Sequence, residues 1–243
     1  MFLPILGYTE ILIYSAAALV PAIILMYYVY RQDKVEKEPG RLLGKLVLGG
    51  VFAALISIVL EGVAQIALSA YLQNTYMSYA GSGIITATYV ALIEEITKFF
   101  FLYKFSWRDP AFNYRFDGIV YAVFVSLGFA AFENILYIFF YGGLSVALPR
   151  ALLAIPAHMS FAVYMGLLYG FAKQAELKGD TGRSNLLLVT GYLMAVLLHA
   201  TYDGSIMIGS DAAVTFFACF VVVLDIVMLF TVHKASKTDE RLY

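Results

Sequence analysis

The stretch that decides the fold is residues 46–72, LVLGGVFAALISIVLEGVAQIALSAYL, in which Glu61 is the one charged residue. A helix needs about 20 residues to cross the roughly 30 Å hydrocarbon layer of a membrane. This stretch is longer than that, so we predict that it forms a membrane-spanning helix.

Six further stretches are similarly apolar, and the polar connectors between them are short: 11–30, 83–105, 118–141, 150–172, 185–207 and 212–232. Of the 243 residues, 62% are hydrophobic and 14% are charged. That balance is more apolar than a soluble domain needs for its core. We therefore predict an all-α fold, a polytopic transmembrane helical bundle of about seven spans in the cell membrane. We expect residues 1–243 to form a single integral membrane domain that the lipid bilayer surrounds.

The basic residues predict the orientation. Sixteen residues are Lys or Arg, and fourteen of them follow spans one, three, five or seven. The opposite side has only Arg150, and Lys98 lies within a span. Because cytoplasmic loops carry the excess of Lys and Arg, we expect the N-terminus outside and the C-terminus in the cytosol.

The composition also gives information about nucleic-acid binding and disulfide formation. The formal net charge is -1, and no basic cluster with interleaved aromatic residues is present, so nothing favours a nucleic-acid partner. The single cysteine, Cys219, cannot form an internal disulfide.

Ionisable side chains within spans are costly in lipid, and each is a candidate for function. The spans contain Glu61, Glu94, Glu95, Lys98, Glu133, His158, His199, Asp203 and Asp225. Glu133, His158 and His199 each lie about eight residues from the outer end of a span, which places them roughly 12 Å below the outer boundary. We expect acids and histidines of four helices to meet in one layer of the outer half of the membrane.

Two spacings join residues on one helix face. Glu94 and Lys98 are four residues apart with the acid first, which favours a helical ion pair, and Glu95 precedes the same lysine by three. His199 and Asp203 are also four apart, so the aspartate could orient the imidazole or bind a reacting carbonyl.

Three other polar residues carry weaker signals. Asn134 follows Glu133 and offers an uncharged hydrogen-bond donor to the expected layer. Glu61 and Asp225 lie in spans that carry no second matching motif, so we interpret both as structural.

Together these residues resemble the motifs of the PrsW family, within the superfamily of CAAX prenyl endopeptidases and bacteriocin-processing membrane proteins. The resemblance covers about residues 83–207. It includes an EExxK motif at Glu94, Glu95 and Lys98, an FxxxE motif with a following Asn at Phe129, Glu133 and Asn134, a histidine at His158, and an HxxxD motif at His199 and Asp203.

The resemblance implies a glutamic-type intramembrane protease that makes the first cleavage of a membrane-anchored anti-sigma factor. It calls for no cofactor and no metal. The prenyl-endopeptidase branch has histidine where this chain has Glu133, which makes a prenylated substrate less expected.

The residues then take acid-base roles. Glu94, supported by Glu95 and Lys98, would deprotonate a water molecule for attack on the scissile carbonyl. His199 with Asp203 would stabilise the oxyanion, and Glu133 or His158 would orient water or protonate the leaving amine.

Two alternatives stay open. His158, His199 and a carboxylate such as Glu133 could hold zinc, although no HExxH motif is present. A transporter or proton relay would also place acids and histidines in mid-membrane, with helix breaks such as the one that Pro156 could cause.

Overall fold

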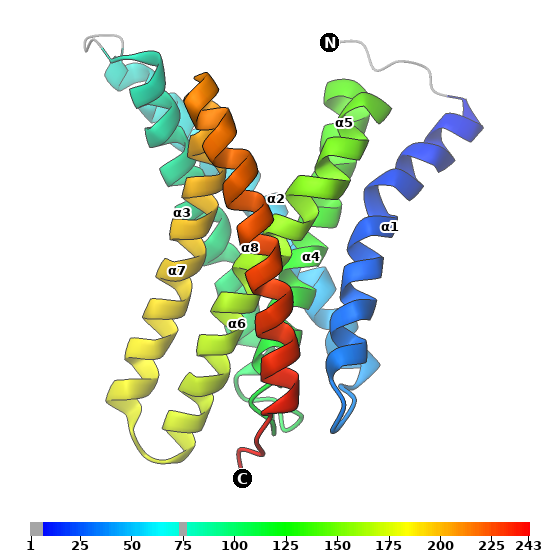
Figure 1. Cartoon of the computed structure of the whole chain (residues 1–243), viewed down its shortest axis with the longest axis vertical. Coiled ribbons are helices and arrows are strands. Elements are labelled where there is room, and N and C mark those ends of the chain that lie inside the picture. Colours follow the sequence, from blue (N-terminus) through cyan, green and yellow to red (C-terminus); the bar gives the residue numbers. More distant parts are fainter. Residues whose placement is uncertain (1–6, 73–76) are drawn as a thin grey trace.

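The computed structural model describes residues 7–72 and 77–243, which form helices joined by short connectors (Figure 1). The helices are α1 (Tyr8–Gln32), α2 (Gly40–Leu72), α3 (Tyr79–Ser106), α4 (Asp117–Tyr137), η1 (Ile138–Gly142), α5 (Leu144–Pro149), η2 (Arg150–Ala154), α6 (Ile155–Leu177), α7 (Thr181–Met207) and α8 (Asp211–Lys237). The two η elements are π-helical. The predicted all-α bundle is confirmed for this part of the chain.

The helices build seven rods, because η1 extends α4, and α5, η2 and α6 follow one another without a connector. Within the described residues, six rods are long and apolar enough to cross a membrane. The remaining rod, α3, has 28 residues and would be about 42 Å long at 1.5 Å per residue. It is not among those six because its interior carries Glu94, Glu95 and Lys98. The protein is therefore a multi-pass membrane protein, and its described residues form seven rods, as the sequence predicted.

The basic connectors gather at one end of the bundle, the lower end in Figure 1, where α8 also ends. There the C-terminal tail packs on the α3–α4 connector. The Arg115 amide donates to the Glu240 carbonyl at 3.0 Å, and the Leu242 amide donates to the Asn113 carbonyl at 2.8 Å. The tail therefore covers part of this end of the bundle.

The fifth rod begins earlier than predicted, at Leu144, and continues to Leu177. Pro156 has no amide hydrogen and cannot bond to the carbonyl four residues before it. The π-helical turn η2 ends at Ala154, two residues before this proline, and accommodates the change in bonding. The rod therefore runs through Pro156 without the helix break that a transporter would favour.

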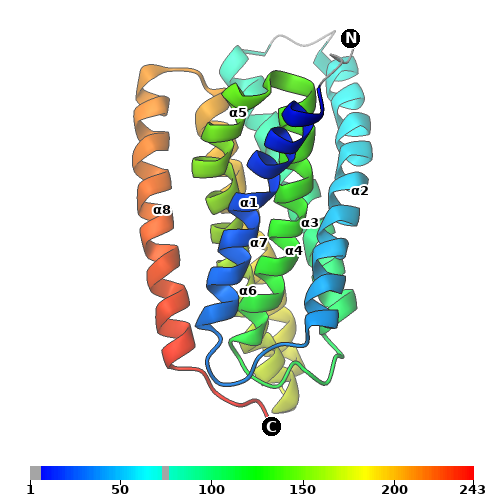
Figure 2. The same cartoon turned by 90° about the vertical axis from the view of Figure 1, so that its right-hand side faces the viewer.

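The most buried rod is α4, which packs against α1, α2, α3 and α6 (Figure 2). Glycine residues allow the backbones of α2 and α4 to approach closely. A Cβ atom added at Gly50 of α2 would lie 2.0 Å from the Val125 carbonyl oxygen, and one at Gly128 of α4 would lie 2.4 Å from the Val47 oxygen. Small residues at helix contacts allow backbones to pack closely in membranes. These contacts fix α2 against α4.

We expect Gly50→Val to lower the stability of the folded bundle, because the new side chain would overlap the α4 backbone. Overpacking of this kind commonly costs about 1–3 kcal/mol. Gly44→Val on the same helix is the matched control, since a Cβ there meets nothing within 4 Å. Thermal unfolding in detergent measures both, and equal unfolding temperatures for the two variants would contradict the close contact.

Candidate active site

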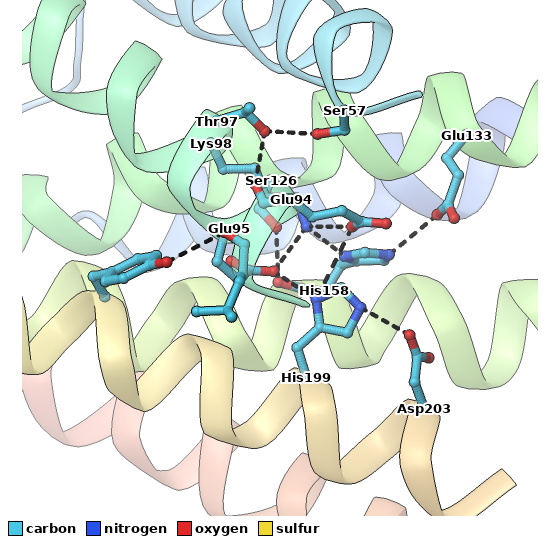
Figure 3. Close-up of polar contacts among 12 residues, drawn as sticks. Ser57, Glu94, Glu95, Thr97, Lys98, Ser126, Glu133, His158, His199 and Asp203 are labelled. Atoms are coloured by element: carbon cyan, nitrogen blue, oxygen red, sulfur yellow. Dashed lines mark hydrogen bonds and ion pairs between the residues drawn. The ribbon is translucent and has the colours of Figure 1, made fainter. Parts of the chain in front are cut away.

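Side chains from four rods meet in one cluster (Figure 3). The cluster contains Glu94, Glu95 and Lys98 from α3, Glu133 from α4, His158 from α6, and His199 and Asp203 from α7. The residues that the sequence placed in one layer are thus brought together.

The ammonium group of Lys98 lies at the centre of this cluster. Its Nζ is 3.0 Å from Glu94 Oε2, 2.8 Å from Glu95 Oε1 and 3.1 Å from His158 Nδ1. It also lies 4.0 Å from the centroid of the Phe129 ring, a cation–π distance. Lysine at this position therefore links α3 to α4 and α6.

The contacts of His158 define its donor and acceptor nitrogens. An ammonium can only donate, so Nδ1 accepts from Lys98 and the ring hydrogen is on Nε2. That nitrogen lies 3.2 Å from Glu133 Oε2, which accepts the hydrogen bond. His158 is therefore held between a cation on one side and an anion on the other.

His199 has a carboxylate at each nitrogen. Nδ1 is 2.9 Å from Glu95 Oε1, and Nε2 is 3.4 Å from Asp203 Oδ2. Because ionised carboxylates only accept, both contacts are satisfied when the ring carries two hydrogens. The Phe161 ring stacks on the imidazole at 5.0 Å between centroids and fixes its plane. The Asp203 contact is long, so Nε2 is the less tightly held nitrogen.

The two acids of the EExxK motif face different surroundings. Glu95 is 1% exposed, and its Oε1 lies between Lys98 and His199. Glu94 lines a cavity, and its Oε1 accepts no hydrogen bond from any residue in the described ranges. Of this pair, Glu94 is the acid that can contact a molecule in the cavity.

The cavity has a volume of about 590 Å³ and is lined by residues of α2, α3, α4, η1, η2, α6 and α7. Its walls include Gln65, Tyr141, Arg150 and Met207, which lie near the ends of rods opposite the basic connectors. The cavity therefore extends from the charged cluster toward the predicted outer side.

Arg150 is a part of the site that we did not predict from the sequence. Its guanidinium donates to Glu133 Oε2 at 2.7 Å and to Asn134 Oδ1 at 2.8 Å. Asn134 was expected to donate into the site, but its amide donates to the Ala18 carbonyl of α1 at 3.2 Å. The one signal for Arg150 was its place as the single basic residue on the outer side.

The two acids that we interpreted as structural differ in position. Asp225 of α8 accepts a hydrogen bond from the Ser160 hydroxyl at 3.2 Å and does not line the cavity. Glu61 of α2 does line it, together with Glu94 and Glu133.

Comparison with known proteins agrees with these motifs. The model of the PrsW family of intramembrane metalloproteases matches residues 38–231. The chain belongs to the PrsW family. It is 35% identical to Protease PrsW of Geobacillus kaustophilus over 77% of each chain. It is 29% identical to Protease PrsW of Clostridioides difficile over 93% of this chain and 92% of that protein. No solved structure gives a significant match. The chain is thus a membrane-embedded peptidase.

The family description includes a metal, so the cluster can be tested for one. Among the described residues, Glu94, Glu95 and His158 are the group whose ligand atoms lie within 4.8 Å of one another. Lys98 Nζ lies within 3.1 Å of all three side chains. Zinc would need to sit about 2.0–2.2 Å from those atoms, where it would collide with a like charge. This arrangement does not fit a metal ion.

The zinc set considered from the sequence, His158 and His199 with Glu133, is not such a group in the part of the chain that the structure describes. The imidazole nitrogens of these two histidines are directed toward carboxylates and Lys98 instead.

We therefore expect cleavage by the purified protein to persist after treatment with EDTA and 1,10-phenanthroline, and its zinc content to be far below one ion per chain. Elemental analysis and a cleavage assay measure this, with a known zinc protease treated in parallel. Stoichiometric metal whose removal abolishes cleavage and whose return restores it would show that Lys98 moves away to admit the ion.

Proposed function

We propose that this protein is an endopeptidase that hydrolyses a membrane-anchored protein near the extracytoplasmic side, using a water molecule activated by Glu94. The supporting observation is the unequal exposure of the two adjacent acids. Glu94 presents Oε1 to the cavity, whereas Glu95 is buried between Lys98 and His199. One acid is thus placed to act on a substrate and the other to hold its neighbours.

In the first step, Glu94 Oε1 takes a proton from water as the water oxygen bonds to the scissile carbonyl carbon. The carbonyl electron pair moves to its oxygen, which becomes an oxyanion. A carboxylate can act as general base when it is within hydrogen-bond reach of the water. The Lys98 ammonium stays on Glu94 Oε2, so it holds the carboxylate in place while Oε1 reacts.

His199 is the group suited to the oxyanion. Its ring is fixed by Phe161 and by Glu95, and Nε2 is held only by the 3.4 Å contact with Asp203. A ring that carries both hydrogens can donate from Nε2 to a developing negative charge. Fixed donors of this kind are a large part of transition-state stabilisation.

Collapse of the tetrahedral intermediate breaks the carbon–nitrogen bond, and the leaving amine takes up a proton. His158 and Glu133 line the same cavity, and the His158 Nε2 hydrogen lies between them. They are placed to orient water and to relay to the amine the proton that Glu94 took from water, so each side chain ends in its starting state. Arg150 keeps Glu133 at this position.

The position of the cavity and the family resemblance support the substrate class that we propose. The cavity extends toward the predicted outer side, so the scissile bond of a membrane-anchored protein would enter from there. A membrane-anchored anti-sigma factor, cut first by this enzyme, is the substrate that we propose.

Glu94→Gln should keep the bundle folded, because an amide oxygen still accepts from Lys98, but should lower kcat by about 10²–10⁴-fold. Asp225→Asn is the matched control, since it makes the same acid-to-amide change outside the cavity and should retain activity. A cleavage assay normalised to protein level compares the two. Wild-type cleavage by Glu94→Gln would remove Glu94 from the mechanism.

The orientation is tested independently. A cysteine introduced at Lys178, in the connector between α6 and α7, should be protected in intact cells from a membrane-impermeant maleimide, because that connector is predicted to be cytosolic. A cysteine at Ser210, between α7 and α8, should react. Labelling of the first and protection of the second would place the cavity on the cytosolic side.

A further inference from the structure

The helix α2 carries a stripe of polar side chains that the proposed mechanism does not use. Between Leu46 and Leu72 its polar residues, apart from Tyr71, are Ser57, Glu61, Gln65 and Ser69. They recur every four residues, which places them along one face of the helix. Much of the remaining surface is apolar and exposed, as expected for a lipid-facing helix.

Contacts on both sides of Glu61 align this stripe with α3. The hydroxyls of Ser57 and Thr97 lie 2.8 Å apart (Figure 3). Two turns further along α2, the Tyr89 hydroxyl donates to Gln65 Oε1 at 2.6 Å. The two helices are antiparallel, so Glu61 lies midway between these contacts, at the level of Glu94.

Glu61 itself has no hydrogen-bond or ion-pair partner among the residues that the structure describes. It is half-buried and lines the cavity. Its neighbours along the stripe are both satisfied, so the missing partner is specific to this position.

The other acids that line the cavity each have a basic partner. Glu94 binds Lys98, Glu133 binds Arg150, and Asp203 faces His199. No basic group in the described residues is paired with Glu61. An unpaired carboxylate at membrane depth is unfavourable, and residues that keep one commonly contact a ligand or ion pathway.

We propose that Glu61 is a specificity-determining residue that binds a lysine or arginine side chain of the substrate. The inference rests on the proposed endopeptidase function. Because Glu61 is level with Glu94, and an extended chain advances about 3.3–3.6 Å per residue, the basic residue lies within about two positions of the bond that is cut. The substrate thus supplies the counter-charge that the cavity lacks.

The test uses synthetic single-span peptides in liposomes that contain the protein. Each peptide has an apolar span followed by a short extracytoplasmic segment, and mass spectrometry locates the bond that the wild type cuts. Peptides that carry Lys, Gln or Glu are then compared, with the substitution made in turn at each of the two residues on either side of the cleaved bond. We expect kcat/KM for the Lys peptide to exceed that for the Gln peptide about tenfold at one position, the scale of a half-buried ion pair.

Glu61→Gln should reduce this ratio to about one, and Glu61→Lys should favour the Glu peptide instead. Asp225→Asn, which removes an acid outside the cavity, should keep the wild-type ratio. The inference is wrong if Glu61→Gln leaves the ratio of kcat/KM for the Lys and Gln peptides unchanged. It is also wrong if Glu61→Gln lowers cleavage of all three peptides equally, because Glu61 then does not distinguish the charge of the substrate.

A binding experiment distinguishes a failure of this inference from a failure of the proposed function. In the Glu94→Gln background, fluorescence anisotropy should show tighter binding of the Lys peptide than of the Gln peptide, and adding Glu61→Gln should abolish the difference. If the wild type cleaves no peptide but this preference remains, the endopeptidase proposal fails while Glu61 keeps its cation site. If neither cleavage nor the preference is seen, both proposals are overturned.

Discussion

The site depends on the interaction of the Lys98 ammonium with Glu94 and Glu95. In surroundings of low dielectric, two neighbouring carboxylates cannot both hold charge unless a cation lies beside them. The lysine supplies it from one turn further along the same helix, so the pairing is built into α3. Its further contacts with His158 and Phe129 then join the ion pairs to α6 and α4.

The glycine contacts explain why α4 and α6 pack closely at one end of the bundle. A Cβ at Gly118 or Gly166 would lie within 2.6 Å of a backbone oxygen on the facing helix, and one at Gly170 would lie 2.2 Å from the Arg115 oxygen just before α4, so α4 and α6 are in near contact at the end with the basic connectors. Toward the other end the rods diverge in Figure 1, and the cavity lies among their side chains there. The cavity therefore lies toward the predicted outer side. Glu94 and His199 line that cavity.

Contacts within one helix could be predicted from the sequence, because a four-residue spacing is enough to place Glu94 beside Lys98 and His199 near Asp203. Contacts between helices could not, since they depend on how each rod is rotated. The π-helical turn η2 is one example: it carries Arg150, whose side chain reaches Glu133. Glu61 is another, because only the alignment of α2 with α3 shows that it lines the cavity.

Peptide hydrolysis within a membrane sets two demands that the cavity lining meets together. A helical substrate keeps every backbone group hydrogen-bonded, and in lipid an unwound segment must find new partners. The scissile carbonyl is therefore exposed only where protein or water can satisfy the groups that unwinding frees. The lining includes the polar side chains of Gln65, Tyr89 and Tyr202 beside the charged cluster, although Gln65 and Tyr89 already bond to each other. In the mechanism that we propose, the polar surface that admits the attacking water would therefore also stabilise the unwound segment of the substrate.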